Sequence, residues 1–329
     1  MINRSREITS VTESGPVVGD SINKRRREQE EMVRKKRRTR EQKSPVLEAV
    51  LAEINFADIQ EILQSIATRC GIDPKGTNIL GREHVFNSEG LVKTESERLS
   101  SYNAARNEIV LDYEIIKETA DSMGISRRLQ FLESLIHELI HGASKVEKSI
   151  FISSKTYMLL TTFLHKLSPI EQPDADISSH RKERLGYGYS DVLNLGDEQK
   201  IVREFFNLFD EGITEKLATE IVLEYVRRNP DFVDKQAVAV YKQNLDKRTS
   251  TYAQSARFAE GLINKLSDKT GVEKRVVWQG ILHGKFSGQS FDDPEVKKLF
   301  DEAFGPEFLQ RLSKANNTQD FVKLCEDYL

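Results

Sequence analysis

The chain has 329 residues, of which 38% are apolar and 31% are charged, against roughly 25% charged in an average soluble domain. Its most apolar stretches, near residues 132–140 and 158–164, are shorter than the ~18 residues that a membrane-spanning helix needs. We therefore expect no membrane span, and the first thirty residues show no pattern of a secretory signal. Cys70 and Cys325 lie too far apart in the sequence for a zinc finger or a disulfide scaffold, which favours free thiols in a reducing, cytoplasmic compartment.

Residues 24–43 form a strongly basic segment with eleven Lys or Arg and four Glu, hence a net charge of +7. Because residues 1–43 contain few large apolar side chains, they cannot offset the entropy of folding, and we expect a flexible arm. Such an arm can bind nucleic acid or an anionic membrane surface electrostatically, or it can be a solvated tail, since no aromatic side chain interleaves it to stack on bases. Lys24 and Arg25, followed by residues 36–40, have the spacing of a bipartite nuclear import signal, which extends the expected location to the nucleus of a eukaryotic cell.

The folded part of the chain is expected to begin at residue 44. Apolar residues recur at helical spacing over residues 46–54 and 58–66, with Asp58 as the expected N-cap of the second segment. This pattern predicts two packed helices, or one kinked helix, before Gly71. The residue pattern changes over residues 76–113, where Gly and Asn interrupt short segments. This pattern predicts a small sheet of two to four strands.

The next helical pattern follows Ser126, the expected N-cap, and contains the HExxH motif over residues 137–141. Side chains four positions apart on a helix differ by only about 40° in direction, so His137 and His141 project side by side and can bind one metal ion. Glu138 lies about 100° further round, where it can act as a general base without binding the metal. Both histidines lie in an apolar stretch, where unpaired imidazoles are costly, so the pattern predicts a metal site.

Two histidines need a third ligand, and Glu211 is the first candidate. It lies with Glu215 on one face of a predicted helix that runs to Arg228. A charged helix start that favours the helix dipole is the alternative interpretation of these two acids.

These two motifs resemble those of the gluzincin zinc metallopeptidases, the thermolysin-like group. By this resemblance one Zn²⁺ per chain is bound by His137, His141 and Glu211, while Glu215 hydrogen-bonds the back of a zinc-bound histidine. The resemblance also implies a zincin-like catalytic core with a small sheet beside the HExxH helix, and peptides or proteins as substrates.

The resemblance further implies an edge strand that pairs with the substrate backbone. We expect this strand at residues 107–112, with Asn107, Ile109 and Leu111 as substrate-binding residues. An oxyanion donor is needed as well; Tyr252, which opens a predicted helix, is the first choice, and Tyr241 and His283 are alternatives.

The spacing of the motifs departs from the gluzincin pattern, because 69 residues separate His141 from Glu211. Glu147, at the position of the third ligand in metzincins, and His165 and His180 therefore remain alternative ligands. Composition predicts a helix over residues 149–167, a loop over 168–179, and a turn or short hairpin over 184–190. The tyrosines of that hairpin, Tyr187 and Tyr189, either line the cleft or pack as ordinary hairpin aromatics.

The final hundred residues show short amphipathic segments that predict a helical bundle closing the cleft. The expected organisation is an arm (1–43), a metallopeptidase core (44–228) and a C-terminal helical subdomain (229–329), with an α+β, mostly helical fold. The expected function is zinc-dependent peptide hydrolysis with Glu138 as general base. One alternative is a peptidase that its arm targets to nucleic-acid-bound proteins, and another is a catalytically silent zinc-binding interaction module.

Overall fold

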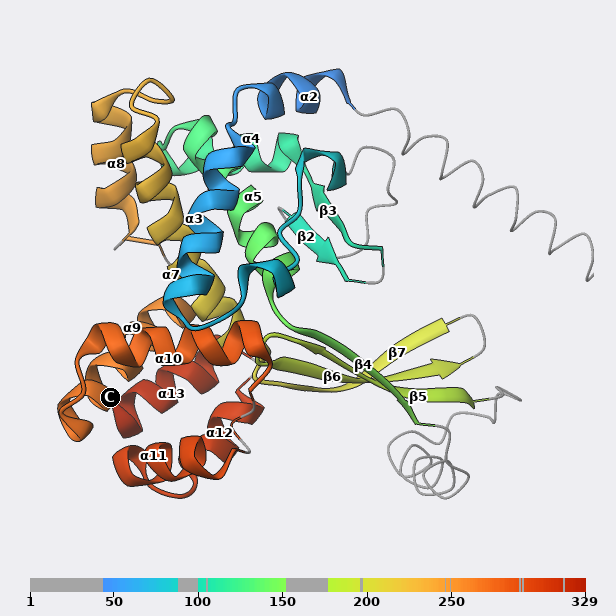
Figure 1. Ribbon diagram of the computed structural model, residues 1–329, viewed down its shortest axis with the longest axis vertical. Helices are drawn as coiled ribbons and strands as arrows, with labels where there is room; N and C mark the ends of the chain where they lie inside the picture. The colour runs from blue at the N-terminus through green and yellow to red at the C-terminus, as the bar shows by residue number, and fades with distance from the viewer. Residues whose placement is uncertain are drawn as a thin grey trace, which may run out of the picture. The chain divides into compact units, whose positions relative to one another are not determined.

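The computed structural model describes residues 44–87, 100–104, 106–151, 177–195, 198–245, 247–248, 250–289, 291, 293–315 and 317–329. Contacts group the chain from Pro45 to Leu329 into one unit, which is mostly helical and contains two small sheets (Figure 1). The predicted α+β, mostly helical fold class is therefore confirmed. The basic arm lies outside the described residues, and the division at residue 228 stays a prediction. Among the described helices, none is both long and apolar enough to cross a membrane.

Two helices open this unit, α2 (Pro45–Ala52) and α3 (Phe56–Arg69). Asn55, not Asp58, is the N-cap of α3: its backbone is extended and its side chain accepts a hydrogen bond from the Asp58 backbone N–H. The prediction of Asp58 as the cap was wrong because the helix begins three residues earlier than its apolar pattern. The apolar face of α3 is buried through Ile59, Ile62, Leu63 and Ile66.

A mixed three-stranded sheet follows, as the sequence predicted. Two 3₁₀ turns, Pro74–Gly76 and Arg82–His84, lead into it. Its strands are β1 (Val85–Asn87), β2 (Ser100–Asn103) and β3 (Glu108–Leu111). The order is β1-β3-β2, with β1 parallel and β2 antiparallel to β3, so β3 is the central strand.

The helix with the HExxH motif is the central helix of the fold. After α4 (Tyr113–Met123), α5 spans Arg127–Ala143 and begins after Ser126, as predicted. It packs against α4, β2, β3 and α7 (Asn207–Arg228). All its residues from Leu129 to Ala143 are buried, so each polar side chain among them needs a partner inside the protein.

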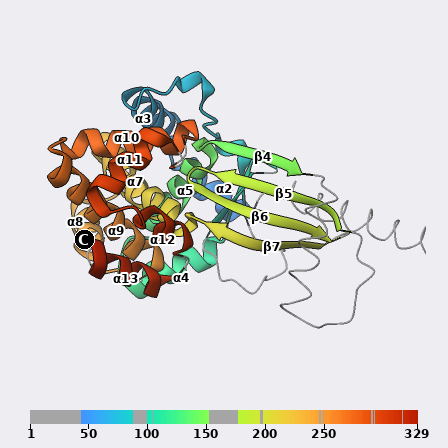
Figure 2. The same cartoon turned by 90° about the horizontal axis from the view of Figure 1, so that it is seen from below.

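The described residues between α5 and α7 mainly form a four-stranded antiparallel sheet. Its strands are β4 (Val146–Phe151), β5 (Ile177–Leu185), β6 (Gly188–Leu195) and β7 (Glu198–Phe205), in that order. Figures 1 and 2 show these strands running side by side away from the helices.

The sequence interpretation of this insert was partly wrong. Residues 149–151 and 177–179 are strand rather than helix and loop, because each pairs with a neighbouring strand; residues 152–176 lie outside the described part. The predicted hairpin is confirmed, and Gly186 in its turn has a φ of +58°, which glycine adopts without a Cβ clash.

The described remainder of the chain is mainly helical, as predicted. The helices are α8 (Lys235–Leu245), α9 (Thr251–Thr270), α10 (Lys274–Ser287), α11 (Pro294–Phe304), α12 (Phe308–Lys314) and α13 (Thr318–Tyr328). Helix α9 packs along α7 and is itself covered by α10, α11 and α13. The two helices that carry the predicted ligands, α5 and α7, are thus held together at the centre of the core.

Candidate metal centre

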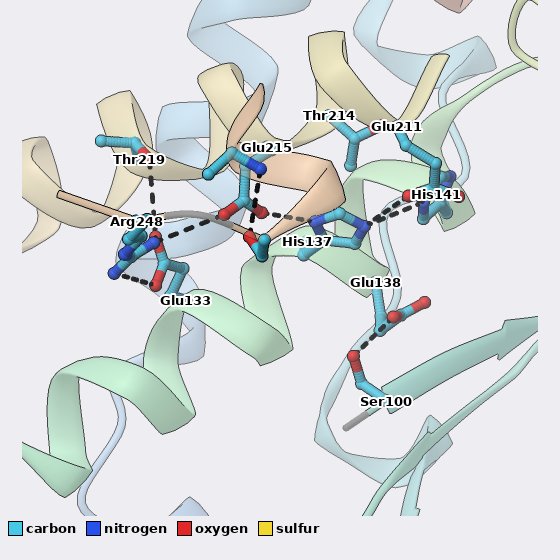
Figure 3. A network of polar contacts seen from close by, with 12 residues as sticks. Ser100, Glu133, His137, Glu138, His141, Glu211, Thr214, Glu215, Thr219 and Arg248 are labelled. Atoms are coloured by element: carbon cyan, nitrogen blue, oxygen red, sulfur yellow. Dashed lines mark hydrogen bonds and ion pairs between the residues drawn. The ribbon is translucent and has the colours of Figure 1, made fainter. Parts of the chain in front are cut away.

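Three predicted ligands, His137 and His141 on α5 and Glu211 on α7, converge in the structure (Figure 3). The two Nε2 atoms lie 3.2 Å apart, and Oε2 of Glu211 lies 3.0 Å from Nε2 of His137 and 3.3 Å from Nε2 of His141. Both imidazoles are buried, and a quarter of the Glu211 side chain is exposed. Residues that the 69-residue insert separates in sequence therefore form one compact triangle of donor atoms.

The triangle has the dimensions of a metal site. Ligand atoms bound at 2.0–2.1 Å to a tetrahedral ion lie about 3.3 to 3.4 Å from one another, close to the three observed distances. Nδ1 of His137 lies 3.1 Å from Oε2 of Glu215, which only accepts hydrogen bonds, so in the neutral ring Nδ1 carries the hydrogen. Nε2 of His137 then presents a lone pair to the triangle. A cation at the centre would satisfy the atoms that face each other there.

The electrostatics of the centre also favour a cation. Burial alone would lower the pKa of His137, but the carboxylates of Glu211 and Glu215 raise it well above its usual range. Burial likewise opposes the charge of Glu211, yet the two histidines hold the pKa of that carboxyl well below its usual range. Among the described residues, carboxylates lie in or around the triangle at positions 133, 138, 210, 211 and 215, and basic side chains bind them from positions 248 and 285. The excess negative charge is what a divalent cation neutralises.

A chain of polar contacts lies behind His137. Beyond Glu215, Nη1 of Arg248 lies 3.4 Å from Oε1 of Glu215, and both terminal guanidinium nitrogens bind Glu133 at 2.7 and 2.8 Å. The hydroxyl of Tyr241 donates to Oε1 of Glu133 at 2.6 Å. Burial and the nearby Glu215 carboxylate raise the pKa of Glu133, and Arg248 and Tyr241 oppose this rise.

A second, shorter chain lies behind His141. Oδ2 of Asp210 lies 3.7 Å from Nδ1 of His141, which makes no hydrogen bond within the described structure. The same oxygen accepts from the fully buried ammonium of Lys285 at 2.7 Å, and Oδ1 accepts from the backbone N–H of Tyr187 at 2.8 Å. A Cβ on Gly186 would collide with Oδ1 of Asp210, so the hairpin turn can approach this carboxylate only with glycine at that position.

The predicted general base, Glu138, lies beside the triangle and is buried. Its Oε1 accepts a hydrogen bond of 2.6 Å from the hydroxyl of Ser100 on β2, and Figure 3 shows its side chain pointing towards that strand. Glu138 is therefore close to the ligands without being one of the three clustered donors.

Of the three candidate oxyanion donors, Tyr252 is the one beside the ligands. It lies in the first turn of α9, its ring stacks on that of His137 at a centroid distance of 5.7 Å, and 41% of the residue is exposed. Tyr241 is fully buried on Glu133. Nδ1 of His283 lies 2.7 Å from the backbone oxygen of Cys70, in a different part of the core.

The prediction that residues 107–112 form the substrate-binding edge strand was wrong. Strand β3 is central, since β1 and β2 pair with its two edges, and both Ile109 and Leu111 are fully buried. Asn107 lies in the turn before β3, where its side-chain oxygen accepts from Asn78 and from the hydroxyl of Tyr102. The outer strand beside Glu138 is β2.

The structure also places the remaining candidates. Glu147 and His180 lie on strands β4 and β5, and His165 lies outside the described residues. Tyr187 is buried and donates to the backbone oxygen of Ile281, and Tyr189 stacks on Phe205, so both pack as hairpin aromatics.

Five polar residues around the centre were not identified from the sequence as parts of it: Ser100, Glu133, Asp210, Arg248 and Lys285. Two of them could have been identified from their sequence positions, because Glu133 lies one helical turn before His137 and Asp210 directly precedes Glu211. Arg248 and Lys285 had no such signal, since a basic residue in a helical region is usually a surface residue.

Comparison with protein-family models finds no match for this chain, and comparisons with curated proteins and with solved structures find none either.

Proposed function

We propose that this chain is a zinc-dependent metallopeptidase, with the ion held by His137, His141 and Glu211. The observation that carries the proposal is the triangle of two Nε2 atoms and one carboxylate oxygen, with the Glu138 carboxylate beside it. Two histidines and one glutamate form a ligand set of catalytic zinc sites, in which three protein ligands leave one position for water or substrate. A zinc ion bound there would supply a Lewis acid that polarises a carbonyl and acidifies water.

The protein's own groups have distinct roles in this proposal. Glu215 accepts the Nδ1–H of His137 and so directs Nε2 into the triangle. The carboxylate of Glu138 takes a proton from the attacking water and transfers it to the nitrogen of the leaving amine. Ser100 holds one oxygen of that carboxylate by its 2.6 Å hydrogen bond, which fixes where the other oxygen points.

Two further elements complete the proposed site. The phenol of Tyr252, stacked on His137 and partly exposed, is the proposed hydrogen-bond donor to the oxyanion. Strand β2, an outer strand of its sheet, is the proposed partner of the substrate backbone by β-strand addition, in place of β3.

The direct test is proteolysis of a denatured protein mixture by the wild-type protein and the Glu138→Gln variant, each with its zinc content measured. Glu118→Gln, an exposed change on α4, is the matched control. We expect zinc in all three proteins, with cleavage by wild type and control and a loss of at least about 100-fold in Glu138→Gln. Equal cleavage by all three would overturn the mechanism. Zinc without cleavage in any of them would indicate a silent metal-binding module.

A further inference from the structure

Arg248 is an almost fully buried cation in the connection between α8 and α9. Its side chain is 8% exposed, and that of Glu133, its main partner, is 3% exposed. Burying an ion pair costs solvation energy that a good geometry only partly returns, so such pairs are poor devices for stability alone. The question is therefore what this pair positions.

The contacts of Arg248 connect the two helices that carry the metal-ligand triangle. Glu133 lies one turn before His137 on α5, and Glu215 lies one turn after Glu211 on α7. The guanidinium binds both oxygens of Glu133, and its Nη1 atom reaches Oε1 of Glu215. It spans α5 and α7 at a level next to that of the ligands (Figure 3).

The Glu133 end of this bridge is fixed from several sides. The Glu133 carboxylate accepts hydrogen bonds from both terminal guanidinium nitrogens of Arg248 and from the Tyr241 hydroxyl. The centroid of the Tyr241 ring lies 5.2 Å from the Arg248 guanidinium carbon. A planar guanidinium with two parallel bonds to one carboxylate has little freedom to rotate. The Nη1 group that faces Glu215 is thus held in a defined place.

We propose that Arg248 is a positioning residue of the metal centre: anchored on Glu133, it holds Oε1 of Glu215 so that Oε2 faces Nδ1 of His137. The inference rests on the proposed metal site and adds to it the group that orients the histidine's partner. Without this contact, His137 is the one remaining hydrogen-bond partner of the flexible Glu215 carboxylate within the described part of the chain. With it, the Nδ1–H tautomer and the aim of Nε2 into the triangle are set before a metal arrives.

The surroundings of His141 explain why this contact matters. Its own carboxylate neighbour, Asp210, is 3.7 Å away and is bound instead by Lys285 and the Tyr187 backbone. Hydrogen bonding to the protein therefore orients His137 much more strongly than His141. The His137 side of the centre is the more fully hydrogen-bonded one, so substitution of Arg248 should change metal binding.

The test substitution at Arg248 must remove the positioning contact and keep the positive charge. Removing a cation near a divalent ion would lower the Coulomb repulsion and mask a loss of order. Arg248→Lys keeps the charge but loses the planar fork that binds Glu133 while reaching Glu215. Arg228→Lys is the matched control, because Arg228 also bridges two glutamates, Glu61 and Glu224, at the far end of α7.

The experiment uses the full chain and Co²⁺ as the probe of the metal site, with dissociation constants from competition with a chromophoric chelator and visible spectra of the bound ion. We expect Arg248→Lys to weaken Co²⁺ binding about 10-fold and to change the spectrum, and Arg228→Lys to change neither. The same substitution in a Glu215→Gln background should have little further effect, because Arg248 acts through Glu215.

Three results would count against the proposal. An Arg248→Lys protein with lowered unfolding free energy but unchanged Co²⁺ affinity and spectrum would reduce Arg248 to a structural residue. Additive effects of Arg248→Lys and Glu215→Gln would show that it does not act through Glu215. Failure of the wild type to bind Co²⁺ would overturn the proposed function itself, and this inference with it. If Arg248→Lys does not fold, Tyr241→Phe, which loosens the Glu133 anchor, replaces it in the same cycle with the same expected direction.

Discussion

The ammonium of Lys285 lies 2.7 Å from Oδ2 of Asp210, the residue directly before the proposed ligand Glu211, and both side chains are buried. This pair joins α10 to the start of α7 and touches the hairpin turn that leads into β6 through Tyr187. A lysine with no exposed surface needs such a partner, because an isolated buried charge is very costly.

Lys285→Met should therefore destabilise the fold strongly. It leaves the Asp210 carboxylate buried without its cation, for which we expect a loss of roughly 3–5 kcal/mol in the free energy of unfolding. Lys297→Met, on the exposed surface of α11, should cost at most about 1 kcal/mol. Urea unfolding measures both. The double variant Asp210→Asn/Lys285→Met should recover much of the loss, and an equally unstable double variant would refute this explanation.

Ser100→Ala should lower activity without releasing the metal. The hydroxyl binds one oxygen of Glu138, so we expect kcat to fall by roughly 10- to 150-fold, the equivalent of one lost hydrogen bond to a charged group at roughly 1.5–3 kcal/mol. Ser101→Ala on the same strand is the control, since successive residues of a strand point to opposite faces. If both variants keep full activity, Ser100 does not orient the base.

Tyr252→Phe tests the proposed oxyanion donor. Loss of one such donor lowers kcat by about 100- to 1,000-fold, and the phenyl ring keeps its stacking on His137, so zinc content should not change. Tyr328→Phe on α13 removes a phenol at a distant position and should leave kcat unchanged. Unaltered kcat in Tyr252→Phe would exclude this residue as the donor.

The thiol of Cys70 should react slowly in the folded protein. Burial raises the pKa of Cys70 to about 11, so its thiolate fraction at pH 8 is roughly a hundredfold smaller than that of an ordinary cysteine. Labelling the Cys325→Ser variant with a thiol reagent at pH 8, with and without denaturant, measures the difference. The rate should rise steeply as pH approaches 11, and a native rate equal to the denatured rate would contradict the burial of this thiol.

Local patterns predicted the elements that carry the site. The apolar periodicity around residues 137–141 and the i, i+4 spacing of Glu211 and Glu215 indicated two helices, and both α5 and α7 are present with these residues facing each other. Helical spacing decides which side chains share a face, so it also predicted that His137 and His141 project together. No pairing with distant segments is needed for these conclusions.

Sheet order and buried ion pairs could not be predicted in this way. The β-branched residues of β3 indicate a strand, but they do not tell whether it is central or an edge, because that depends on β1 and β2. For the same reason residues 149–151 were predicted as helix although they pair with β5. Arg248 contacts partners that lie 33 and 115 residues away in the sequence, and Lys285 contacts a partner 75 residues away. No local sequence pattern indicates contacts over such separations.

The ligand assignment is tested most directly by the zinc content of the wild-type protein and of Glu211→Ala, determined by elemental analysis after dialysis against a mild chelator. Glu220→Ala, an exposed change on the same helix, is the control. We predict about one zinc ion per chain in the wild type and the control, and a clear loss in Glu211→Ala. Zinc retained unchanged in Glu211→Ala, or absent from all three proteins, would contradict a metal centre formed by His137, His141 and Glu211.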